Sequence, residues 1–194
     1  SLMQEVFRRR LDWLNEERMR VLNTLEREAA GKALKPSQIV DGFFGTLLRM
    51  ADDEKRGGTT FLRLLGRTLT DPSEFIRTFL AHEYAAVVDR YKEALFKALP
   101  DVPKAEIVWR FHFMLGATSY AIAGTDALRL VTDWQIEESD SIDRMDRLVP
   151  RLMSFLLGGL RSPLPQFSDA AATVETKAGH TTTAANAGPT VDSK

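Results

Sequence analysis

The sequence offers few side chains for metal or acid–base chemistry near neutral pH. It has no cysteine, and its three histidines are His82, His112 and His180. His82-Glu83 resembles the start of the HExxH zinc motif, but Ala86 stands where that motif needs its second histidine. With no thiolate ligands and no paired histidines, we expect neither a metal ion nor another cofactor.

No motif for covalent catalysis or nucleotide binding occurs in the sequence: a GxSxG turn, a Walker loop and a GxGxxG loop are all absent. The acidic residues between Asp126 and Asp146 belong to a polar run, which is usually solvated surface. An enzyme that used His112 would need an acid or a base beside it, and the sequence shows none. We therefore expect a protein that is not an enzyme.

Binding of a small molecule is the chemistry that remains. Ligand pockets are mostly apolar, with a few polar groups that fix the ligand's orientation. Each aromatic side chain taken alone fits plain core packing better, but a few members of the set should line one pocket. The aromatic candidates are Trp13, Phe43, Phe44, Phe61, Tyr84, Trp109, Phe113 and Tyr120.

Three polar side chains could orient such a ligand. Arg63 and Arg67 lie among leucines, where a guanidinium could pair with a carboxylate or phosphate, although a salt bridge to a neighbouring Glu or an exposed helix face explains them better. His112 lies between two phenylalanines, so burial would favour its neutral form. It could anchor a ligand, belong to a dimer contact, or be a hydrogen-bonded core histidine.

Helices must position these candidates, because apolar residues recur at helical spacing almost throughout and no stretch of alternating polarity appears. Proline and glycine divide the pattern into segments, and the one from 125 to 140 reads as a surface loop. The fold class is all-α, with about six helices. The expected helices cover residues 2–30, 37–51, 59–69, 72–99, 104–123 and 141–160.

Composition indicates one globular domain with an appendage. The 194 residues are 44% hydrophobic and 27% charged, with a net charge of −1, and they contain neither a secretion signal nor an apolar run that could span a membrane. A cytoplasmic location is therefore expected. Residues 168–194 are rich in Ala and Thr and lack aromatic residues, so we expect a disordered tail after a domain at 1–167.

Two stretches carry a resemblance to a known family. The opening helix, VFRRRLDWLNEERMRVLNTLE from Val6 to Glu26, and FLRLLGR from Phe61 to Arg67 resemble the C-terminal effector-binding and dimerisation domain of TetR-type transcriptional regulators. The branch that they resemble includes fatty-acid-responsive repressors. The resemblance implies that the chain lacks the helix-turn-helix half, so DNA would be contacted only through that missing N-terminal domain, and near-neutral charge agrees with this.

The resemblance further implies a homodimer and a small apolar effector that controls DNA binding allosterically. Helices 104–123 and 141–160 would form a four-helix bundle with their symmetry mates, and Gly116, Ala117 and Ala121 would allow close approach. The alternative is a helical interaction or lipid-carrier module unrelated to DNA. The expected interface residues are Ile107, Phe111, Leu115, Thr118, Met145, Val149, Leu152, Phe155 and Leu156.

The expected tail gives a first testable prediction. Deletion of residues 168–194 should leave the melting temperature unchanged to within about two degrees, because a tail that is not packed contributes little to stability. Thermal unfolding followed by circular dichroism checks this, and a loss of many degrees would mean that the tail packs on the domain.

Overall fold

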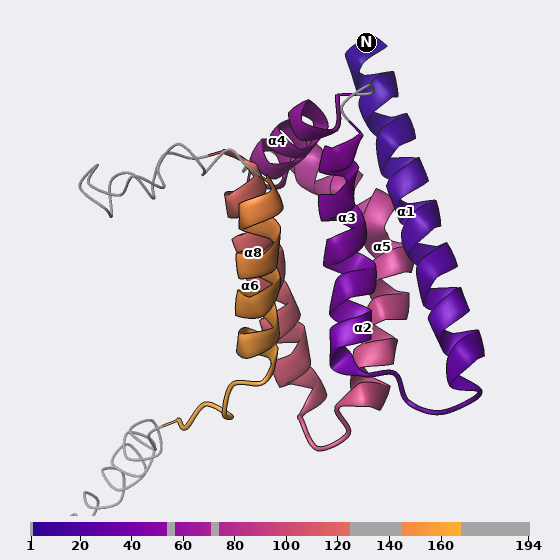
Figure 1. The fold of residues 1–194 in the computed structure, drawn as a ribbon. Helices are drawn as coiled ribbons and strands as arrows, with labels where there is room; N and C mark the ends of the chain where they lie inside the picture. Colours follow the sequence, from indigo (N-terminus) through magenta and orange to yellow (C-terminus); the bar gives the residue numbers. More distant parts are fainter. Residues whose placement is uncertain (1, 54–56, 71–73, 125–144, 168–194) are drawn as a thin grey trace, which may run out of the picture. The chain divides into compact units, whose positions relative to one another are not determined.

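Helices make up the regular structure of the computed structural model, which describes residues 2–53, 57–70, 74–124 and 145–167 (Figure 1). The chain divides into a unit of residues 1–162 and a second unit of residues 163–194, and all the helices belong to the first. The all-α fold predicted from the sequence is confirmed. The described elements are α1 (Leu2–Ala29), α2 (Pro36–Val40), a π-helix (Asp41–Gly45), α3 (Thr46–Arg49), a 3₁₀ turn (Met50–Asp52), α4 (Gly58–Leu69), α5 (Glu74–Ala98), α6 (Lys104–Ile122) and α8 (Met145–Leu160).

Helix α1 buries one stripe along its length. Leu11, Leu14 and Leu22 are completely buried, and they recur at the spacing of one helical face. Arg18 falls on the same stripe and is also buried. The helix ends before Gly31, whose φ of +84° lies in the left-handed region that glycine adopts at little cost.

The sequence predicted one regular helix over residues 37–51, and the structure inserts a π-helical turn into it. The backbone N–H of Thr46 bonds to the carbonyl of Asp41, five residues earlier, as in a π-helix. Phe43 and Phe44 lie in this turn and are both buried, with their ring centroids 4.9 Å apart. The widened turn thus directs two consecutive large side chains into the interior.

Helix α5 lies beside α1 and is tied to it by hydrogen bonds (Figure 1). The Tyr91 hydroxyl donates to the carbonyl of Arg18 at 2.7 Å, and the amide of Asn15 donates to the carbonyl of Glu83 at 2.9 Å. The rings of Tyr91 and Phe43 are 5.1 Å apart. These contacts join α1, α5 and the π-helix around one apolar core.

Helix α6 packs between α4 on one side and α8 on another. Gly66 of α4 allows the close approach, since a Cβ there would lie 2.7 Å from the nitrogen of Ala123 and 2.7 Å from the carbonyl oxygen of Ser119. Arg110 of α6 donates to the carbonyl of Leu160 in α8 at 2.7 Å. Residues 125–144 and 168–194, which include the expected loop, the start of the last expected helix and the expected tail, lie outside the described residues.

Candidate functional site

A mostly apolar cavity of about 180 Å³, open to solvent on one side, is formed by the helical unit, and we name it the inner cavity. Its walls come from α1, the π-helix, α3, α4, α5 and α6. Most of the side chains that line it are apolar. Few polar side chains reach it. It is lined by Arg18, Phe43, Phe44, Leu47, Leu69, Leu80, Ala81, Tyr84, Val88, Leu115, Thr118 and Ser119.

Arg18 supplies the positive charge of the inner cavity, and it is only 1% exposed. Its Nε donates to the carbonyl of Phe43 at 2.9 Å, and its Nη1 donates to Oδ1 of Asn15 at 3.3 Å. Its guanidinium carbon lies 3.8 Å from the ring centre of Phe43 and 5.5 Å from that of Tyr84. All of these partners are neutral, and among the described residues no carboxylate forms an ion pair with Arg18.

Burial dominates the protonation of the polar groups around this arginine. Burial lowers the pKa of the Arg18 guanidinium, and its charge interaction and hydrogen bond with Tyr84, together with a charge interaction with Tyr91, oppose that shift only in part. Burial likewise raises the pKa of Tyr84 and that of Tyr91, while the charge of Arg18 acts in the opposite direction. Both tyrosines are therefore neutral at ordinary pH and supply no counter-charge.

Thr118 lines the same cavity and carries a buried hydroxyl without a partner. Its side chain is buried, and among the described residues its Oγ1 is the buried side-chain atom that no hydrogen bond satisfies. Ser119, next in the wall, donates its hydroxyl to the carbonyl of Leu115 at 2.7 Å. The inner cavity thus combines an apolar lining, a buried cation and a free hydroxyl.

Arg110 shows how this fold satisfies a buried arginine elsewhere. It is as well buried as a core residue, and its Nε donates to the carboxylate of Glu106 at 2.8 Å. A second bond runs to the carbonyl of Leu160. Arg110 therefore has an anionic partner within the chain, whereas Arg18 has only neutral ones.

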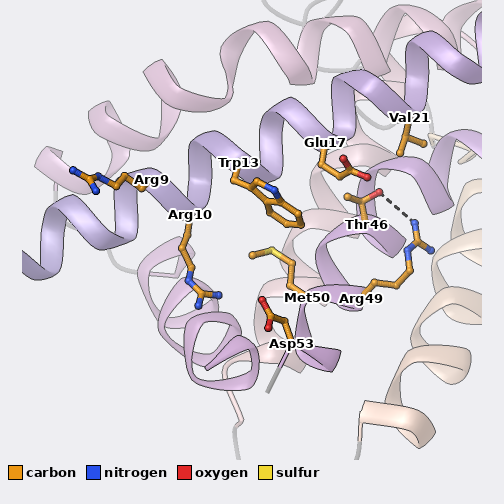
Figure 2. A pocket seen from close by; sticks show the side chains of 9 residues that line it. All are labelled: Arg9, Arg10, Trp13, Glu17, Val21, Thr46, Arg49, Met50 and Asp53. Atoms are coloured by element: carbon orange, nitrogen blue, oxygen red, sulfur yellow. Dashed lines mark hydrogen bonds between the residues drawn. The ribbon is translucent and has the colours of Figure 1, made fainter. Parts of the chain in front are cut away.

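A second depression, which we name the outer groove, lies between α1 and the segment from α3 to the 3₁₀ turn and has a volume of about 500 Å³ (Figure 2). Figure 2 shows Trp13 and Met50 pointing toward one another across it. The guanidinium of Arg49 donates hydrogen bonds to Oγ1 of Thr46 at 3.3 Å and to Oδ1 of Asp41 at 3.0 Å. The full lining is Arg9, Arg10, Trp13, Glu17, Val21, Thr46, Arg49, Met50 and Asp53.

The aromatic residues predicted to line a pocket are divided among four places. Phe43, Phe44 and Tyr84 lie together around the inner cavity, and Trp13 lies in the outer groove. Phe61 is buried between α4 and α1, 5.6 Å from the ring of Phe7. The other three belong to the exposed face of α6, described next.

That exposed face of α6 carries Trp109, Phe113 and Tyr120, which are 58%, 63% and 51% exposed, and we name it the aromatic stripe. The rings of Trp109 and Phe113 lie 5.7 Å apart, and His112 lies 5.9 Å from Phe113. None of these four side chains lines the inner cavity or the outer groove. His112 is exposed rather than a core histidine.

The residues predicted for the dimer interface lie mainly on the opposite, inward faces. Leu115 is half-buried, and it lines the inner cavity together with Thr118. Val149 is half-buried, Phe155 is 69% exposed, and the side chain of Met145 is outside the description. Those packed into this chain's own core are Ile107, Phe111, Leu152 and Leu156.

The two arginines proposed as ligand anchors, Arg63 and Arg67, are exposed on α4, and Arg63 lies against Gly124. Neither reaches the inner cavity. The arginine that does reach it, Arg18, was missed, although the sequence contained a signal: it replaces an apolar residue in the stripe of Leu14 and Leu22, four residues from each.

Within the described ranges, no group of three side chains could hold a metal ion. None of the helices described combines the length and the apolar character that a membrane crossing requires.

Comparison with known proteins gives one family. The family model described as "Tetracyclin repressor-like, C-terminal domain" matches residues 41–159, which is more than half of the chain. The match covers the π-helix, the cavity-lining parts of α5 and α6, and almost all of α8. No curated protein matches the chain.

Proposed function

The chain belongs to the family of tetracycline-repressor-like C-terminal domains, and on that premise we propose that it senses a small effector in the inner cavity and dimerises through the aromatic stripe. One observation supports both parts: α6 carries Leu115, Thr118 and Ser119 on the side of the cavity and the aromatic stripe on the other side. A ligand and a partner subunit would therefore act on the same helix.

The proposed partner is a second copy of this chain, bound to the exposed sides of α6 and α8. Exposed aromatic side chains are enriched in the buried centres of protein interfaces, and three of them on one helix are costly to leave in water. Phe155 of α8 adds a fourth large exposed ring. We thus assign dimer contact to the outward residues of these helices instead of to Ile107 and Phe111, which are buried in the chain's own core.

Three glycines support this assignment. Gly116 in α6 and Gly158 and Gly159 in α8 have no atom within 4 Å of the position a Cβ would take. A glycine inside a helix costs about 1 kcal/mol relative to alanine, and no packing within the described part of the chain explains that cost. Close approach of helices from a second subunit would explain it, because small residues let helix backbones come together.

The proposed transmission runs from the inner cavity to α1. Arg18 joins α1 to the carbonyl of Phe43, and α1 is the helix that would connect to a DNA-reading unit in a regulator of this type. A ligand that binds better to one arrangement of α1 and α6 would shift the population toward it. A coupling of about 1–3 kcal/mol between cavity and DNA-reading unit is sufficient for regulation. We propose binding, and no catalytic step, for this site.

Native mass spectrometry of the purified chain tests the proposal. We expect a dimer, because the aromatic stripe would be buried, and a discrete small-molecule adduct where the inner cavity retains its ligand. A monomer across the micromolar concentration range would contradict the dimer assignment. A dimer that binds no small molecule under any condition would instead favour a helical interaction module that carries no effector.

A further inference from the structure

We propose that the effector of the inner cavity is a small carboxylic acid, bound as its anion by Arg18 and Thr118. This inference rests on the proposed sensing function and adds the chemical class of the ligand. It is argued from the charge, the unsatisfied hydrogen bond and the volume of the cavity.

The charge comes first. An arginine taken out of water loses several kcal/mol of hydration, and a paired anion normally restores part of it. Arg110 has such an anion in Glu106, 2.8 Å away, whereas the contacts of Arg18 are the carbonyl of Phe43, the amide oxygen of Asn15 and two aromatic rings. An anionic ligand in the cavity would provide the counter-charge that the described part of the chain does not.

The unsatisfied hydrogen bond points to the same ligand. The Oγ1 of Thr118 is buried without a partner, although buried hydroxyl groups are nearly always bonded. It belongs to α6, while Arg18 belongs to α1, and both line the one cavity. A carboxylate has two oxygens, so it can accept from a guanidinium and from a hydroxyl at once.

The volume and the lining limit the rest of the molecule. An apolar cavity of about 150 Å³ holds one benzene molecule. The inner cavity has about 180 Å³ and is walled by Phe43, Phe44 and Leu80, so it suits a compact aromatic or short acyl body. One cation and one free hydroxyl match a single carboxylate group.

The outer groove is the competing site for an anion, because Arg9, Arg10 and Arg49 line it. Two of those arginines are already neutralised in part: Arg9 pairs with Glu5 at 2.9 Å and Arg49 with Asp41 at 3.0 Å. Their water-exposed charges would attract anions weakly and without selection for shape. The inner cavity is the better site for a specific acid.

The test uses benzoate as the probe and benzamide as its neutral counterpart of the same shape, in titration calorimetry on the full chain at pH 7. Carboxylic acids are ionised there, since their pKa is about 4. We expect one benzoate per subunit, bound about tenfold to a hundredfold more tightly than benzamide, as a charge-assisted hydrogen bond allows. Equal affinity for benzoate and benzamide would overturn the proposal of a carboxylate ligand and would still allow an apolar effector. If neither compound bound, the proposal would also be overturned, but the separate test for a dimer would not be affected.

Variants locate the bound anion. Arg18→Met keeps the length and apolar stem of the side chain and should abolish the preference for benzoate over benzamide. Arg49→Met is the matched control, because it removes a cation from the outer groove, and its preference should equal that of the wild type. Loss of the preference in Arg49→Met, with Arg18→Met unchanged, would place the anion in the outer groove and contradict the proposal.

Thr118→Val keeps the test decisive if Arg18→Met does not fold. The substitution removes a buried hydroxyl that has no partner, so the variant should fold at least as well as the wild type. Its benzoate affinity should fall by about threefold to tenfold with benzamide affinity little changed. An unchanged benzoate affinity in this folded variant would show that the hydroxyl does not meet the anion.

Discussion

A Phe113→Arg chain is expected to be monomeric at concentrations where the wild-type chain is a dimer. Phe113 is 63% exposed in the single chain, so an arginine there costs the monomer little, within about 0.5 kcal/mol. At the centre of a dimer interface the same change would bury a charge twice, once per subunit, and weaken association by about a hundredfold or more. Sedimentation velocity over a range of concentrations measures the subunit number, and circular dichroism checks the fold.

Phe111→Arg is the control, because it lies two residues away on the opposite face of α6. Phe111 is buried, and its ring lies 5.1 Å from that of Phe43. An arginine in that place would leave an unpaired charge in the core and should unfold the chain or drive it to aggregate. A Phe113→Arg chain that stays dimeric would contradict the aromatic stripe as the interface, and a soluble monomeric Phe111→Arg chain would favour the inward face predicted from the sequence.

The sequence could not decide which face of α6 points inward, and the reason is physical. Hydrophobic periodicity identifies the inner face of a helix only where the other face is polar. In α6 the inward residues Ile107 and Phe111 alternate with the outward residues Trp109 and Phe113, so both faces are apolar. The sequence also predicts that this helix has too much apolar surface for one neighbour, and Trp109, Phe113 and Tyr120 are exposed on it. Which side of α6 carries the exposed apolar residues could be decided only from the positions of α4 and α8, which pack against its other side.

Two further features were open to sequence reasoning to different degrees. Arg18 could have been found, since an arginine between Leu14 and Leu22 on a buried stripe predicts a buried charge. The π-helical turn could not, because Asp41–Gly45 continues the same apolar pattern as the α-helical residues on either side. Yet that turn places Phe43 in contact with Arg18 and so completes the wall of the inner cavity. The hydrophobic periodicity of the sequence predicted the helices, whereas the cavity depends on contacts between helices that are far apart in the sequence.

The second large effect is expected at Gly66, where α4 packs closely against the end of α6. In a helix, alanine should stabilise by about 1 kcal/mol relative to glycine. At Gly66 the added methyl group would lie 2.7 Å from backbone atoms of Ala123 and Ser119, which cannot rotate away as a side chain could. The helices would have to separate, at a cost of about 1–3 kcal/mol beyond that gain. Gly66→Ala should therefore lower the melting temperature by several degrees, at about 2–4 °C per kcal/mol.

The matched control is Gly116→Ala in α6, where a methyl group meets no neighbouring atom of the described residues within 4 Å. Measured in the Phe113→Arg background, so that no partner covers the stripe, it should raise the melting temperature, whereas Gly66→Ala in that background should lower it. If Gly66→Ala were as stabilising as Gly116→Ala, α4 would not set the position of α6.

Because Ser119 and Thr118 reach the inner cavity from that stretch of α6, the separation caused by Gly66→Ala should also weaken benzoate binding. A shared loss of stability and affinity would show that the packing of α4 on α6 shapes the effector site.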